Sequence, residues 1–194
     1  MIEEKQFFYN TSLVSKLAFE NHKLLYRGYV SSVNDIKNNL TAESIRGQSN
    51  KNYSYYRSLK KEESYNLNSV ILHELFFNNI GDGNTKPGKR FHDLVEKHFG
   101  SLEAWAKDFM ACATSARGWC MAGYERRTGC LINVLQDAYN TDMILGIEPL
   151  VVLDLYEHGY ISDYDINVQK YINTFMKVIS WQTVEERMVA HNVR

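Results

Sequence analysis

The sequence predicts an α+β protein: an N-terminal α-helical hairpin lobe, then a C-terminal lobe with a small antiparallel three-stranded sheet flanked by helices. Three observations predict this. Apolar residues recur at helical spacing over much of residues 12–80, three short apolar runs lie between residues 118 and 156, and helical periodicity returns from residue 162. Helices followed by a short run of strands are typical of this class. We assign residues 1–82 to the first lobe and 83–194 to the second.

The first lobe is expected to contain two main helices. Residues 12–40 carry an apolar stripe, with Ser12 as the expected N-cap and Gly28 as a point where the helix bends or splits. The polar stretch of residues 41–64 is interpreted as a connection with room for a short helix. The second helix is predicted over residues 63–79, and it ends at the turn-rich "GDGNTKPGK".

The second lobe is expected to begin with two helices and continue into the sheet. The first helix ends at Gly100, and Ser101 caps the next one. Strands are predicted over residues 118–125, 130–137 and 149–156, with "ERRTG" as the turn between the first two. One helix is expected over residues 162–180 and a last one over 181–190.

The bulk composition narrows the class of protein. The chain has 194 residues and a formal net charge of −1, which gives no global reason to expect nucleic acid as a partner. No apolar run approaches the roughly 20 residues needed to span a bilayer. The start "MIEEKQFFYN" lacks the features of a signal peptide, so we expect a cytoplasmic protein. The three cysteines, Cys112, Cys120 and Cys130, are expected to be reduced and mostly buried.

Four residues form a candidate metal site. Asp154 ends an apolar run and His158 follows one helical turn later, while His73 and His22 lie in apolar stretches of the two N-terminal helices. Imidazoles and a carboxylate together suit iron, manganese or zinc. Each histidine alone is more often an ordinary core residue, so the hypothesis depends on the set.

Several motifs resemble those of the iron/manganese superoxide dismutases. "DLYEHGY" resembles the "DxWEHAY" signature of that family, and "HELFF" resembles its "HxxFW". "FGSLEAWAKDF", "RGWCM", "LQDAYN" and the closing stretch from "YISDYD" to "EERM" match further family motifs in the same order. The resemblance implies one manganese or iron ion between the two lobes and a superoxide dismutase activity.

The resemblance also implies the ligands. His73, Asp154 and His158 match three of them by motif. For the fourth, one alignment of the first helix places Asn21 at the ligand position and another places His22 there. We favour His22, because asparagine is a poor ligand for these ions.

Further residues have implied roles. Gln136 matches the glutamine that bonds metal-bound water in the manganese type, which favours manganese or the use of either metal, and Tyr29 matches the tyrosine at the substrate gateway. Trp119 and Tyr156 match aromatic positions around the metal. Glu157 and Tyr160 match residues at a homodimer interface.

Two other functions stay open on the sequence. The family tryptophans are replaced by Tyr156 and by Met121, and a pocket widened in this way suits a diverged metal-dependent oxidase or oxygenase. A structural or interaction protein without a metal is the other alternative. The expected substrate of the enzyme is a small anionic or diatomic molecule, with no nucleic acid and no membrane as partner.

Overall fold

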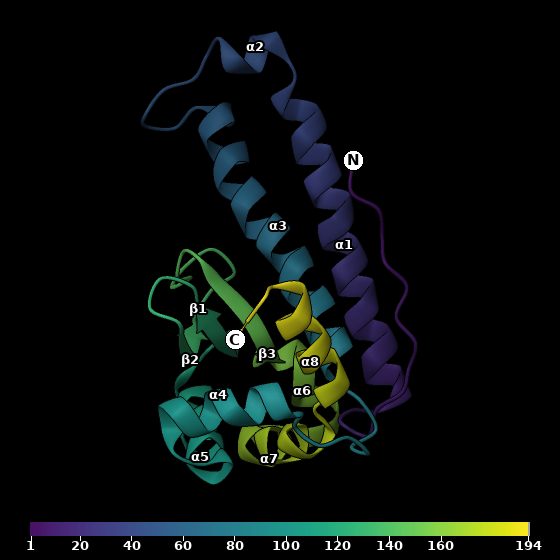
Figure 1. Cartoon of the computed structure of the whole chain (residues 1–194). Coiled ribbons are helices and arrows are strands. Elements are labelled where there is room, and N and C mark those ends of the chain that lie inside the picture. The colour runs from purple at the N-terminus through teal and green to yellow at the C-terminus, as the bar shows by residue number, and fades with distance from the viewer. Residues whose placement is uncertain (194) are drawn as a thin grey trace.

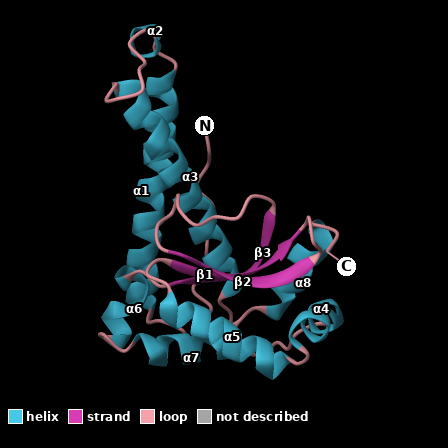
Figure 2. Cartoon of the chain, turned by 90° about the vertical axis from the view of Figure 1, so that its left-hand side faces the viewer, coloured by secondary structure: helices cyan, strands magenta, loops and turns pink. Residues whose placement is uncertain are grey.

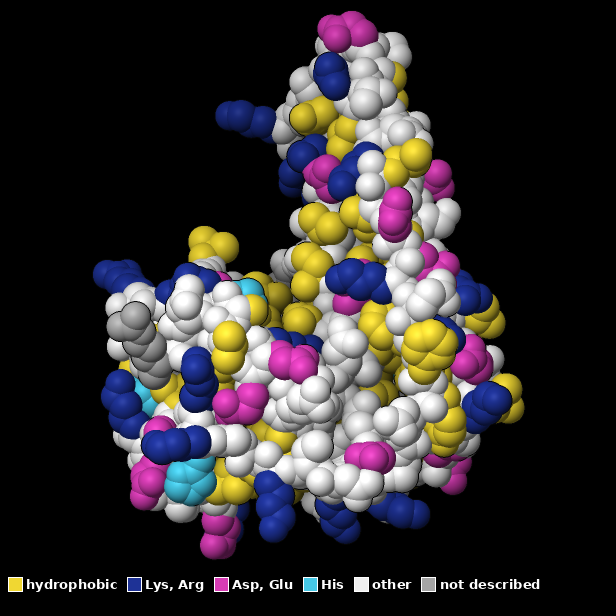
Figure 3. All heavy atoms as spheres, turned by 45° about the vertical axis from the view of Figure 1, so that its right-hand side comes forward, with side chains coloured by type: hydrophobic (Ala, Val, Ile, Leu, Met, Phe, Trp, Pro, Cys, Tyr) yellow, Lys and Arg dark blue, Asp and Glu magenta, His cyan; other side chains and the backbone are white. Residues whose placement is uncertain are grey.

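A long helical hairpin forms the N-terminal part of the computed structural model, which describes residues 1–193. Helices α1 (Lys16–Leu40) and α3 (Tyr55–Asn79) pack side by side, and the short α2 (Glu43–Arg46) lies at the tip. The hairpin projects well beyond the part of the molecule that contains the sheet (Figures 1 and 3). The predicted α+β class and helical N-terminal part are confirmed.

The expected N-cap of the first helix is wrong, and the helix is not split at Gly28. Its N-cap is Ser15 rather than Ser12, because the Ser15 side chain accepts a hydrogen bond from the Ala18 backbone N–H. The helix also continues without interruption through Gly28. Its buried residues keep one stripe on both sides of that glycine, from Phe19 to Val33, so packing against α3 holds the helix together there.

The second main helix begins earlier than predicted, at Tyr55 rather than near residue 63. Ser54 caps it by accepting a hydrogen bond from the Arg57 N–H at 3.2 Å. In the first turns of this helix Leu59 is buried and most of its neighbours are exposed. A helix with so narrow an apolar face gives little periodic signal in the sequence.

The sheet has the predicted three antiparallel strands, in the order β2-β1-β3 (Figure 2). They are β1 (Trp119–Glu125), β2 (Cys130–Gln136) and β3 (Ile147–Asp154), so Leu155 and Tyr156 lie beyond the third strand rather than in it. Trp119 pairs with Gln136 on one side and with Asp154 on the other. Paired residues share a face of the sheet, so these three side chains point the same way.

Five helices complete the fold: α4 (Lys89–Phe99), α5 (Leu102–Ser115), α6 (Glu157–Tyr164), α7 (Val168–Val178) and α8 (Trp181–Ala190). Figure 2 shows α5 and α7 below the sheet. The single helix predicted over residues 162–180 is wrong, because Asp165 has φ 51° and ends α6. A non-glycine residue in that region cannot continue a right-handed helix.

Two smaller findings concern the cysteines and the helix lengths. All three cysteines are free thiols, but only Cys120 is fully buried, whereas Cys112 and Cys130 are partly exposed. Within residues 1–193, no helix is both long enough and apolar enough to cross a membrane.

Candidate metal centre

Four elements bring the candidate ligands together. His22 comes from α1, His73 from α3, Asp154 from the last position of β3 and His158 from the first turn of α6. One potential ligand atom of each residue lies within 4.8 Å of those of the other three. Asn21, the alternative to His22, is exposed, while His22 is 5% exposed and lies on the buried stripe of α1.

The carboxylate of Asp154 lies at the centre of this group. Its Oδ2 atom is 3.1 Å from His22 Nε2, 3.2 Å from His158 Nε2 and 3.8 Å from His73 Nε2. The His22 ring lies edge-on to the rings of both His73 and His158, with centroids 5.0 and 4.9 Å apart. Three imidazoles from different directions therefore face one carboxylate oxygen.

Hydrogen bonds from outside the group fix the orientation of two of its members. His73 Nδ1 lies 2.6 Å from the backbone carbonyl oxygen of Ser69, one turn earlier in α3. A carbonyl only accepts, so Nδ1 carries the proton and Nε2 presents its lone pair to the centre. Asp154 Oδ1 accepts the backbone N–H of Tyr156 at 2.9 Å, which turns Oδ2 toward the histidines. Such outer contacts are typical of metal ligands.

The donor atoms fit a bound cation. His22 Nε2 and His73 Nε2 are buried and form no hydrogen bond with any described residue, although His22 Nε2 is only 3.1 Å from the carboxylate. Buried polar nitrogens without a partner are unusual, and here they converge on one point. Imidazole nitrogens and one carboxylate at such spacing suit iron, manganese or zinc.

Burial keeps these groups in the protonation states that a cation requires. Burial lowers the pKa of His73 to about 3, and the neighbouring His22 acts in the same direction. Burial also lowers the pKa of His22. For Asp154, burial opposes ionisation, but the hydrogen bond from His158 and the close approach of His158 and His22 outweigh it and lower the pKa. Neutral imidazoles beside an ionised carboxylate are the forms that bind metal.

The predicted aromatic residues surround the group. Trp119 is fully buried, with its ring edge-on to His73 at 5.3 Å. Tyr29 lies against His73 with centroids 5.4 Å apart, and Tyr156 stacks on His158 at 5.4 Å. These rings form an apolar wall around the centre, which strengthens electrostatic interactions inside it.

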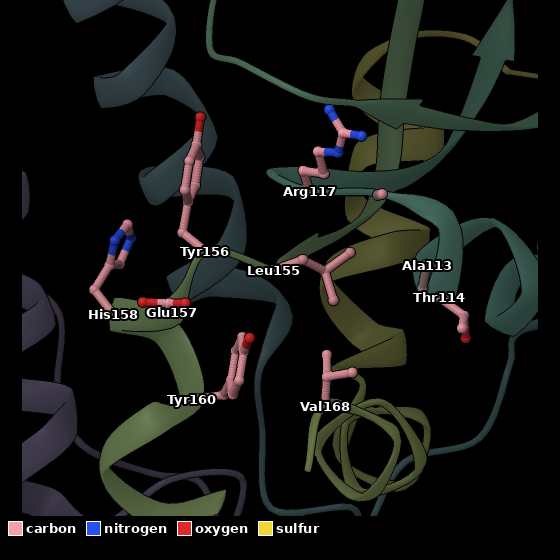
Figure 4. Close-up of a pocket in the computed structure, with 10 residues that line it drawn as sticks. Ala113, Thr114, Arg117, Leu155, Tyr156, Glu157, His158, Tyr160 and Val168 are labelled. Atoms are coloured by element: carbon pink, nitrogen blue, oxygen red, sulfur yellow. The ribbon is translucent and has the colours of Figure 1, made fainter. Parts of the chain in front are cut away.

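The predicted interface residues lie beside a cavity of about 620 Å³ next to the centre. Figure 4 shows Tyr156, Glu157 and His158 together at one side of it, with Arg117 across from His158 and Tyr160 below. Glu157 is exposed and Tyr160 is partly exposed. His158 is the most exposed of the four candidate ligands, with 31% of its side chain accessible. The cavity therefore reaches the centre from this side.

Gln136 contacts Tyr139, a residue near the centre that the sequence analysis did not single out. Gln136 is buried, and its Nε2 donates to the backbone carbonyl of Tyr139 at 2.9 Å. Tyr139 is 1% exposed and its ring stacks on His73 at 5.9 Å. In the sequence, Tyr139 is the aromatic residue of the "LQDAYN" motif. Nothing in that motif predicts that the turn after β2 brings its ring to the centre.

Comparisons with known proteins agree with this geometry. The C-terminal domain of the iron/manganese superoxide dismutases matches residues 87–187. A "Superoxide dismutase [Fe]" of Aquifex aeolicus is 38% identical over 172 residues, which cover 87% of this chain and 79% of the relative. A protein of the same name from Cupriavidus metallidurans is 32% identical, covering 93% and 90%. "Superoxide dismutase [Mn] 1" of Halobacterium salinarum is 28% identical, covering 86% and 82%.

Proposed function

The chain belongs to the iron/manganese superoxide dismutase family, and we propose that it converts superoxide to oxygen and hydrogen peroxide at a single iron or manganese ion. The observation that carries the proposal is the convergence of His22, His73, Asp154 and His158, with two buried imidazole nitrogens lacking any other partner. In the overall reaction, two superoxide ions and two protons give one oxygen and one hydrogen peroxide. The bound ion supplies the one-electron couple that this reaction needs.

The residues of the chain hold the ion and form its surroundings. Asp154 is the anionic ligand, and it compensates part of the positive charge of the ion inside a region with little water. The Ser69 carbonyl holds the His73 ring in the tautomer that binds metal. Trp119 and Tyr156 pack against His73 and His158, Tyr29 lies against His73, and Gln136 is buried at the end of β2. We leave the choice between iron and manganese to metal analysis, since relatives of both names match the chain.

Metal content and superoxide turnover of purified protein test this function. We expect a single iron or manganese ion per chain and rapid turnover in the wild type. In His22→Ala we expect a metal content lower by at least about tenfold and no turnover, because the removed imidazole is a ligand. His191→Ala is the matched control: this histidine is exposed and pairs with Glu148 at the surface.

Two outcomes contradict the proposal in different ways. Bound metal without superoxide turnover points to another oxygen chemistry, such as that of an oxidase, on the same fold. A wild-type protein that binds neither metal removes both enzymatic functions and leaves a structural or interaction protein. A His22→Ala protein that keeps full metal and activity shows that the fourth ligand lies elsewhere.

A further inference from the structure

Tyr139 is the most deeply buried of four tyrosines that surround the candidate metal centre. Its ring stacks on Tyr156 at 4.9 Å, lies edge-on to Tyr65 at 4.9 Å and packs against Tyr29 at 5.4 Å. Tyr29, Tyr65 and Tyr156 are all partly exposed. A buried phenol is a large apolar ring with one polar end, and that end normally has a hydrogen-bond partner.

Two side-chain amides hold the backbone of Tyr139 in place. Its carbonyl oxygen accepts a hydrogen bond from Asn68 Nδ2 at 2.7 Å and another from Gln136 Nε2 at 2.9 Å. Asn68 belongs to α3, the helix that carries His73, and Gln136 ends β2. The turn that carries Tyr139 is thus fastened to two of the elements that build the centre. The amide hydrogen that Gln136 donates to the Tyr139 carbonyl is therefore not donated to the centre.

The hydroxyl of Tyr139 contacts a second phenol that itself packs against a candidate ligand. It is 3.4 Å from the hydroxyl of Tyr29, whose ring packs against His73. The Tyr29 hydroxyl is the donor in that contact, so the Tyr139 hydroxyl proton has no acceptor among the described residues. The Tyr139 hydroxyl is therefore buried beside a partly exposed phenol, and its own proton is available to a molecule at the centre.

We propose that the Tyr139 hydroxyl is the hydrogen-bond donor to the small anion or solvent molecule that the centre takes up, and that Gln136 is a positioning residue acting through Tyr139. This assignment rests on the proposed function, since it requires a metal-bound centre that admits a small anion. A neutral hydroxyl inside a dry site stabilises a developing anion effectively, because it needs no reorganisation of water. Tyr29 links this donor to the protein surface.

Azide affinity of the metal-loaded protein, measured by absorbance titration, tests the assignment without relying on turnover. Tyr139→Phe keeps the ring and removes only the hydroxyl, and we expect azide binding to weaken by about tenfold or more. Tyr164→Phe is the matched control: it removes a hydroxyl from a partly buried tyrosine outside the candidate centre, where that hydroxyl donates to the Leu13 carbonyl. Its azide affinity should stay within about twofold of the wild type.

The positioning role of Gln136 is tested by a double-mutant cycle. Gln136→Met should weaken azide binding on its own, because the Tyr139 turn loses one of its two amide contacts. In the Tyr139→Phe background the same change should have little further effect, since the donor is already gone. Equal effects in both backgrounds would show that Gln136 acts directly and would overturn this part of the assignment.

The outcomes separate this assignment from the proposed function. Unchanged azide affinity in Tyr139→Phe overturns the assignment even where superoxide turnover is rapid. Weakened azide binding in a metal-loaded protein without superoxide turnover supports the assignment and removes the proposed function. A wild type that binds no iron or manganese overturns both. Where Tyr139→Phe fails to fold, Tyr29→Phe decides, because removing the adjoining hydroxyl should also weaken azide binding.

Discussion

Asp154 is a fully buried carboxylate whose neighbours are imidazoles rather than permanently charged side chains. The pKa of Asp154 is lowered, so its carboxylate is ionised near neutral pH. Burial lowers the pKa of His22 and of His73, so these imidazoles are neutral there. The protein without metal therefore buries a net negative charge. Burying such a charge without compensation is costly. A bound cation removes this cost, so metal binding and folding should be coupled.

The histidine pKa values predict how the metal-free protein responds to acid. In the unfolded chain His22 and His73 titrate near about 6.5, whereas in the folded protein their pKa values are lower, about 3 for His73. Between pH 6.5 and about 3 the unfolded state therefore binds more protons. We expect the free energy of unfolding to fall with decreasing pH, by up to about 1.4 kcal/mol per pH unit from His73, with His22 acting in the same direction.

Urea unfolding of the metal-free protein at pH 7, 6 and 5 measures this slope. In His73→Gln the slope should be smaller by the contribution of that one histidine. The stabilisation from Asp154 belongs to a lower window, because its pKa is depressed: it is present above about 3.8 and lost below that pH. Equal slopes in the wild type and His73→Gln would contradict the pKa assignment.

At this scale the sequence predicted the four residues that converge in the candidate group, and the part it missed has a physical reason. Asp154 and His158 are four residues apart across the end of a strand and the start of a helix, so local geometry alone brings them together. His22 needed a choice of helix register that only packing against α3 decides. Tyr139 reaches the centre because Asn68 and Gln136 fasten its turn, and long-range contacts of that kind leave no periodic pattern.

At the scale of elements, one partly buried arginine of α8 joins the helix and the strand that carry two of the candidate ligands. Arg187 of α8 donates to Asn79 Oδ1 at 2.6 Å, to the Leu75 carbonyl at 2.7 Å and to the Leu150 carbonyl at 2.8 Å. Asn79 Oδ1 also accepts the Val152 N–H. Since α3 carries His73 and β3 carries Asp154, this network fixes the distance between them.

Arg187→Met should therefore affect both stability and the centre. It leaves the Asn79 and Leu150 oxygens without a charged donor, and we expect the free energy of unfolding to fall by about 3 kcal/mol. Metal content should fall as well, because α3 is no longer fixed to β3. Arg126→Met is the control: that arginine pairs with Glu148 at the surface, so its loss should cost less than about 1 kcal/mol.

Denaturant titration and metal analysis of Arg187→Met and Arg126→Met test whether this network holds α3 and β3 together. A stability of Arg187→Met equal to that of Arg126→Met would show that the buried network does not hold the elements together.

Sequence patterns predicted the sheet and most helices, but not this network or the end of α6 at Asp165. Both depend on single polar residues, whose contacts are set by the assembled fold rather than by local periodicity.

At the scale of the whole molecule, the cavity beside His158 marks the face where a second copy is expected. His158 is the only one of the four candidate ligands with substantial exposure, and Glu157 forms no ion pair with any described residue. The family resemblance implies that this glutamate bonds the ligand histidine of the partner subunit. A second chain placed on this face would close the cavity and shield both centres from bulk water.

Sedimentation velocity over a range of protein concentrations tests this arrangement. We expect the wild type to be a dimer at micromolar concentration and Glu157→Ala to dimerise at least about tenfold more weakly, because each dimer loses two charge-assisted hydrogen bonds to imidazoles. Glu96→Ala, at an exposed position of α4 away from this face, should leave dimerisation unchanged. A monomeric wild type, or equal dimerisation of both variants, would place the interface elsewhere and leave His158 open to solvent in the active protein.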